Sequence, residues 1–167
     1  MDIHTIIASQ YRATLDMLTE TVNNCPEALW VDPAHENQFW HIAYHTLFFA
    51  HLYLHNGERD FVAWEKHRRE YQFLGPVPWP PHHAPRIEEP YTQTEIAEYL
   101  AVCREEVERK VPSLDLEAPS GFPWLHFNKL ELQFYNIRHI QHHVGQLTDR
   151  LRNHERIGVQ WIAARQA

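Results

Sequence analysis

Apolar side chains return every three or four positions in four stretches of the chain, the spacing of an amphipathic helix. We expect helices over about residues 2–24, 36–56, 92–111 and 128–152. No stretch alternates apolar and polar residues for long enough to make a strand. Four helices of this length predict an all-α fold, a four-helix bundle.

Capping residues and helix breakers support these bounds. Thr92 with Glu95, and Asn128 with Glu131, have the spacing of a capping box at a helix start. Pro26 cannot continue the first helix. These residues mark the expected starts of the third and fourth helices and the expected end of the first.

The apolar positions of the fourth helix predict which of its faces is buried. The apolar positions that we expect along this stripe are Leu130, Phe134, Ile137, Val144, Leu147 and Leu151.

A proline-rich stretch separates the second and third helices. Residues 75–91, GPVPWPPHHAPRIEEPY, cannot form a helix interior and predict a long surface connection. A further short helix is expected within residues 59–71, RDFVAWEKHRREY, just before it.

Length and composition indicate one globular domain over residues 1–167, with 44% apolar residues. A net charge of −7 argues against a nucleic-acid partner. The longest apolar run, TLFFA, is too short to span a membrane, and the first residues do not resemble a signal peptide. Cys25 and Cys103 form no disulfide framework, which favours a cytoplasmic location and two buried, unreactive thiols.

Histidines carry the strongest chemical pattern. Three of the 14 histidines fall within NIRHIQHHVGQL, residues 136–147. His139 and His143 are four apart, so their imidazoles share one helix face and could bind one metal ion. His142 is turned by about 100° and is expected in solvent.

The second helix supplies candidates for a third ligand. His41 and His45 are four apart, and His51 and His55 form another such pair. A pair from one helix and a single histidine from another leave an open position, as in catalytic zinc sites. Buried neutral histidines without a metal would explain the same residues.

Other metal and phosphate motifs are missing from the sequence. It contains no HExxH of zinc proteases, no ExxH in the long helices and no glycine-rich phosphate loop. A histidine-only site is therefore the remaining candidate for metal chemistry.

The segments HIAYHTLF and RHIQHHVGQL together resemble the DinB-like superfamily, and the resemblance covers nearly the whole chain. It implies a helical bundle that binds a divalent metal through three histidines, and a homodimer. It assigns His139 and His143 as ligands, with His45 as the third and His41 as its alternative or an additional ligand. Some members transfer low-molecular-weight thiols to small electrophiles. The proline-rich connection is not a family hallmark, so the substrate is not implied.

Two classes of function follow for such a site. A divalent ion, whether Zn²⁺, Ni²⁺ or Fe²⁺, would activate water for hydrolysis or a thiol for transfer to a small molecule. Asp149 lies nearly two turns from the histidines, which slightly favours thiol transfer. Tyr44 and His142 are candidate proton carriers, and Gln146 could orient a histidine. The alternative is a non-catalytic bundle whose metal serves stability or interaction.

Overall fold

The computed structural model describes residues 2–166, and in that range the regular structure is entirely helical. This confirms the expected all-α class. The α-helices are α1 (Ile3–Asn23), α2 (Glu27–Trp30), α3 (Phe39–Leu52), α4 (Gln93–Lys110) and α5 (Lys129–Glu155). Two short 3₁₀ helices, η1 (Glu58–Asp60) and η2 (Val111–Ser113), lie in the connections.

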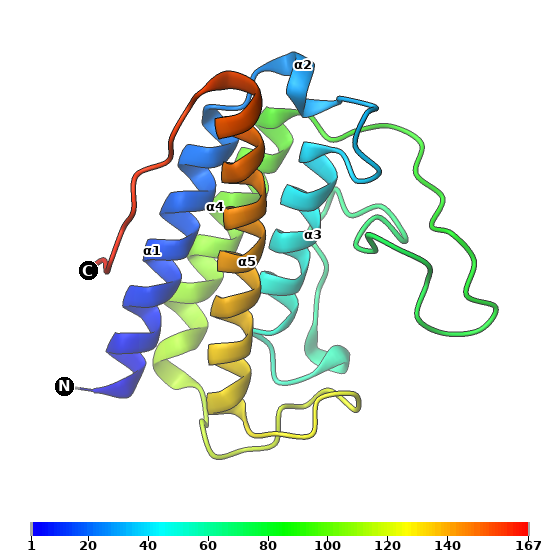
Figure 1. Cartoon of the computed structure of the whole chain (residues 1–167). Helices are drawn as coiled ribbons and strands as arrows, with labels where there is room; N and C mark the ends of the chain where they lie inside the picture. Colours follow the sequence, from blue (N-terminus) through cyan, green and yellow to red (C-terminus); the bar gives the residue numbers. More distant parts are fainter. Residues whose placement is uncertain (1, 167) are drawn as a thin grey trace.

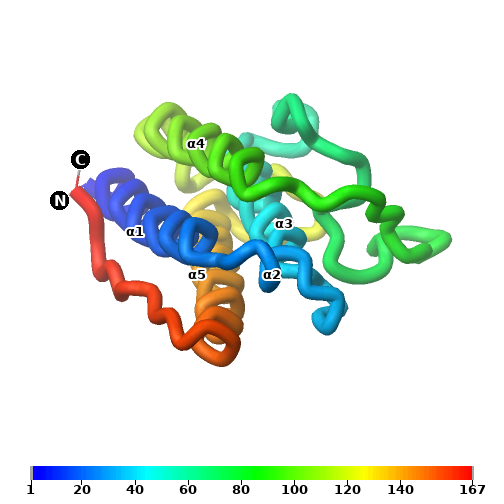
Figure 2. Tube along the Cα trace, turned by 90° about the horizontal axis from the view of Figure 1, so that it is seen from above, coloured from blue at the N-terminus to red at the C-terminus, as the bar shows by residue number. Residues whose placement is uncertain are grey.

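The four long helices lie side by side (Figure 1). Both α1 and α3 pack against α4 and against α5. Seen from above in Figure 2, the segment after α5 returns along the outside of α1. Its Arg165 guanidinium donates to the Asp16 carboxylate at 2.8 Å, which fastens this segment to α1.

Helix α3 is the most apolar of the long helices and is buried on nearly all sides. Its Trp40, Tyr44 and Leu47 are almost fully excluded from solvent. The connection between α3 and α4 also packs against α3. Tyr71 of this connection is buried, and its ring lies 5.9 Å from that of Trp40. A histidine on α3 is therefore positioned by packing around the whole helix.

The buried face of α5 differs in part from the predicted stripe. Phe134 was expected to point inward, but it is 57% exposed. Gln133 and Asn136 are fully buried instead. The Tyr11 hydroxyl of α1 donates to Gln133 Oε1 at 2.8 Å, and Asn136 Nδ2 donates to the same hydroxyl oxygen at 2.9 Å. These bonds explain how polar side chains can occupy core positions.

The helix starts follow the capping residues. Thr92 and Glu95 form the complete capping box at the start of α4. The Asn128 side chain accepts the Glu131 N–H at 2.9 Å at the start of α5. The predicted second helix is shorter than expected, because α3 begins at residue 39 and ends at residue 52. Helix α2 was not predicted.

The connection from α3 to α4 is irregular. The expected helix within residues 59–71 is wrong apart from the single turn η1. Residues 75–91 have no helix, as their prolines predict. Aromatic contacts fix this segment: Trp64 stacks on Tyr99 of α4 with ring centroids 4.6 Å apart. Within residues 2–166, no helix is long and apolar enough to cross a membrane.

Candidate metal centre

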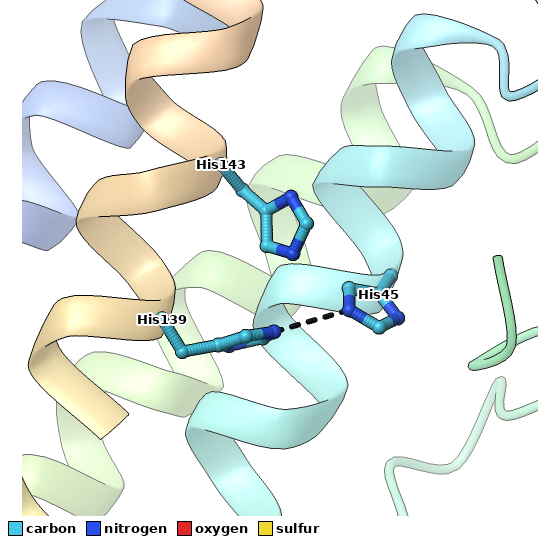
Figure 3. A group of neighbouring side chains, drawn as sticks. All are labelled: His45, His139 and His143. Atoms are coloured by element: carbon cyan, nitrogen blue, oxygen red, sulfur yellow. Dashed lines mark hydrogen bonds between the residues drawn. The ribbon is translucent and has the colours of Figure 1, made fainter. Parts of the chain in front are cut away.

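Three histidines from two helices meet between α3 and α5 (Figure 3). His45 comes from α3, and His139 and His143 come from successive turns of α5. One ring nitrogen of each can be chosen so that all three lie within 4.8 Å of one another. All three rings point into the space between the two helices (Figure 3).

The His45 ring is oriented by the connection. Its Nδ1 lies 2.6 Å from the main-chain oxygen of Gln72, which can only accept a hydrogen bond. Nδ1 therefore carries the proton, and in the neutral ring Nε2 keeps its lone pair. This is the tautomer that a metal ligand needs.

The His143 ring is oriented within its own helix. Its Nδ1 donates to Gln146 Oε1 at 3.1 Å, one turn further along α5. The neutral ring again leaves the lone pair on Nε2. The expectation that Gln146 orients a histidine agrees with this contact.

The His139 ring completes the group. Its Nε2 lies 3.1 Å from His45 Nε2, although 94 residues separate the two. Its Nδ1 is buried and has no hydrogen-bond partner among the described residues. Nitrogen ligands of one tetrahedral zinc ion, bonded at about 2.0–2.1 Å, lie about 3.3–3.4 Å apart. The separation of these two Nε2 atoms is close to that value.

Burial keeps the three imidazoles neutral. Loss of solvent, followed by the neighbouring His139, holds the pKa of His45 well below its usual value of 6.5. Burial, with His143 and His142 adding to it, lowers the pKa of His139 to about 3. Burial also lowers the pKa of His143, against the bond to Gln146, which raises it. Neutral imidazole is the form that binds metal, so these residues fit a divalent ion.

His41 does not join the group. It is buried, and its Nε2 lies 2.8 Å from the main-chain oxygen of Tyr71, one residue before the carbonyl that orients His45. Between the two candidates on α3, the geometry therefore favours His45.

The remaining residues that the sequence suggested for a chemical role lie outside the three-histidine group. His142 is exposed, as expected from its position on α5. The Tyr44 hydroxyl bonds to His67 Nδ1 at 2.6 Å, and this contact does not involve the three histidines. Cys25 and Cys103 are buried free thiols, and burial raises the pKa of Cys25 to about 12. Neither cysteine has the properties of a nucleophile.

A second group of this kind lies near the C-terminal end of α3, where the chain faces α4. His51, His55 and Glu106 bring ligand atoms within 4.8 Å of one another. The sequence shows the histidine pair, but Glu106 comes from α4 and was not predicted. Nothing in the local sequence could have paired it with the histidines, because the contact depends on how α3 and α4 pack.

No family model, curated protein or solved structure matches this chain.

Proposed function

We propose that the chain is a divalent-metal-binding protein of the DinB-like superfamily, folded as a four-helix bundle over residues 1–167. His45, His139 and His143 are its metal ligands. Its activity is that of a metal-dependent transferase, moving a small thiol to an electrophile, or of a hydrolase. A homodimer and a cytoplasmic location belong to the same proposal.

The observation that carries the proposal is the orientation of the imidazoles. Two of the rings donate their Nδ1 protons to fixed acceptors, the Gln72 carbonyl and the Gln146 side chain. Such bonds are the usual support of metal-bound histidine. They leave Nε2 lone pairs directed into one space between α3 and α5.

Three protein ligands leave a coordination position for water or substrate. A divalent ion held there lowers the pKa of a bound water or thiol, which makes a nucleophile at neutral pH. The group itself contains no carboxylate that could act as a general base. This favours thiol transfer, because a thiol needs less help to lose its proton than water does. The transferred thiolate would form the new carbon–sulfur bond as the leaving group departs.

The test strips the protein with a chelator and reloads it with Zn²⁺, Ni²⁺ or Fe²⁺. Each form is incubated with glutathione, bacillithiol or mycothiol and an alkyl halide, and thiol loss is followed. Ester and amide hydrolysis is assayed in parallel. We expect thiol loss that needs the metal, disappears in His143→Ala and persists in His142→Ala.

A non-catalytic metal site is the second candidate. The burial of His143, which is only 7% exposed, favours this candidate, because a catalytic site needs a coordination position that substrate can reach. In that case the metal would raise the midpoint of unfolding, and neither assay would respond to it. That result would contradict the enzymatic part of the proposal.

A further inference from the structure

We propose that His51, His55 and Glu106 form a second divalent-metal site, between α3 and α4 and separate from the three-histidine group. The ligand set, two histidines and one glutamate, is one that catalytic zinc sites use. It does not depend on the proposed function, because it shares no residue with that group.

Both histidines are held rigidly. His51 is 4% exposed and His55 is 3% exposed. The Phe61 ring contacts both imidazoles, with centroids 5.0 Å and 5.3 Å away. Two imidazoles one turn apart, fixed by the same aromatic ring, would lose little conformational freedom on binding an ion.

The hydrogen bonds of these rings leave nitrogen atoms free for a ligand. His55 Nδ1 donates to the main-chain oxygen of His51 at 3.0 Å, so its Nε2 keeps the lone pair. His51 Nδ1 lies 3.2 Å from the Tyr99 hydroxyl. When that Nδ1 donates to the hydroxyl oxygen, His51 Nε2 is also free, and it has no other partner among the described residues.

Glu106 approaches from α4. Its Oε2 lies 3.8 Å from His55 Nε2, which is too long for a hydrogen bond. Two ligands of one zinc ion are about 3.3–3.4 Å apart, so a small closure would let both bind it. The Glu106 side chain is 15% exposed, and a carboxylate this buried needs a cationic partner.

Arg109 is the present partner of Glu106, at 2.5 Å. Its side chain is 63% exposed, so it can turn into solvent when an ion takes its place. A carboxylate that binds a guanidinium at this distance already sits in a place suited to a cation.

The site borders a cavity of about 550 Å³. Besides Glu106, the charged residues in its lining are Asp60, Glu65, Arg109 and Lys110. The three carboxylates outnumber the two cations, so the lining carries no excess positive charge against a divalent ion. The open coordination position would face this cavity.

The first experiment equilibrates the metal-free protein with buffered Zn²⁺, removes excess by dialysis and measures zinc by plasma mass spectrometry. Glu106→Gln removes the carboxylate with little change in shape. Glu105→Gln is the matched control, since Glu105 is exposed on the same helix and outside the group. We expect Glu106→Gln to lose about one zinc ion per chain and Glu105→Gln to lose none.

The second experiment repeats this in a His139→Ala, His143→Ala background, which removes the three-histidine group. That protein should keep about one zinc ion, and adding Glu106→Gln should remove it. A folded double variant without zinc would overturn the second site, as would zinc that is insensitive to Glu106→Gln. If the double variant does not fold, the comparison of Glu106→Gln with Glu105→Gln in the intact protein decides. These outcomes can be told apart from failure of the proposed three-histidine site. If that site binds no zinc, the double variant will hold as much zinc as the wild type.

Discussion

His45 Nε2 and His139 Nε2 lie 3.1 Å apart across the interface of α3 and α5. His45 Nδ1 already donates to Gln72, so a neutral His45 offers a lone pair toward His139. The two rings can share a proton donated by His139, or both can face a cation. His143 donates its Nδ1 proton to Gln146, so its Nε2 also has a free lone pair. If the rings face a cation, His143 can therefore be the third ligand.

Removing a ligand should abolish tight metal binding. His143→Ala is expected to weaken zinc affinity by more than the roughly 100-fold that loss of an orienting residue causes. His142→Ala, its neighbour on the exposed face of α5, should change affinity little. Competition with a chromophoric chelator measures both, in a Glu106→Gln background so that one site is observed. Equal losses in the two variants would contradict the assignment.

The orienting role of Gln146 gives a subtler prediction. Gln146→Ala should lower zinc affinity by about 10–100-fold, because His143 Nδ1–H then lacks its acceptor. The exposed position of Gln146 means that stability should hardly change. Gln141→Ala, on the same helix and without a side-chain hydrogen bond among the described residues, is the control. Unchanged affinity in Gln146→Ala would show that the contact does not support the metal.

The metal-free protein should lose stability as the pH falls. The pKa of His139 is lowered from 6.5 to about 3 by burial and by the adjacent histidines. Above pH 6.5 this imidazole is neutral in both the folded and the unfolded state, so its protonation does not reduce the free energy of unfolding. Below pH 6.5 the imidazole binds a proton in the unfolded state, whereas in the folded state it stays neutral. The free energy of unfolding then falls by about 1.4 kcal/mol per pH unit from this group alone.

Urea unfolding of the metal-free protein at about pH 7.5, 6.5 and 5.5 measures this loss. Between about pH 6.5 and pH 5.5, the free energy of unfolding should fall less in His139→Gln than in the wild type. Identical pH dependence in the two proteins would contradict a neutral, buried His139.

A substitution at Tyr11 should lower the stability of the fold without changing the affinity for zinc. Tyr11→Phe leaves the buried Gln133 and Asn136 without their shared hydroxyl, which should cost about 1–3 kcal/mol of unfolding free energy. Zinc affinity should stay within about twofold, since the hydrogen bonds of the Tyr11 hydroxyl go to Gln133 and Asn136 and not to the three histidines. Chemical denaturation and chelator competition on the same variant test both statements. A large loss of affinity would mean that the core network also shapes the site.

Local sequence predicted the parts of this fold that depend on local chemistry. Thr92 and Asn128 mark helix starts because their side chains satisfy backbone N–H groups a few residues away. Residues 75–91 are irregular because proline excludes helix there. The pairing of His139 with His143 follows from one helical turn.

What the sequence missed depends on contacts between distant elements. Phe134 was expected in the core because it is apolar, yet Gln133 and Asn136 take the buried face through bonds to Tyr11. The sequence favoured His45 and kept His41 as its alternative, but only the packing of α3 on α5 places the His45 ring, and not the His41 ring, in one group with His139 and His143. A pattern of apolar residues along one helix contains neither kind of information.

X-ray absorption at the zinc edge tests the three-histidine centre most directly. The sample is the Glu106→Gln variant reloaded with zinc and dialysed. We expect about one zinc ion per chain with three imidazole nitrogens at about 2.0–2.1 Å and one ligand that is not imidazole, such as a water oxygen, completing the shell. Fewer than three imidazoles around the ion, or no zinc retained, would contradict the proposal that His45, His139 and His143 bind a metal together.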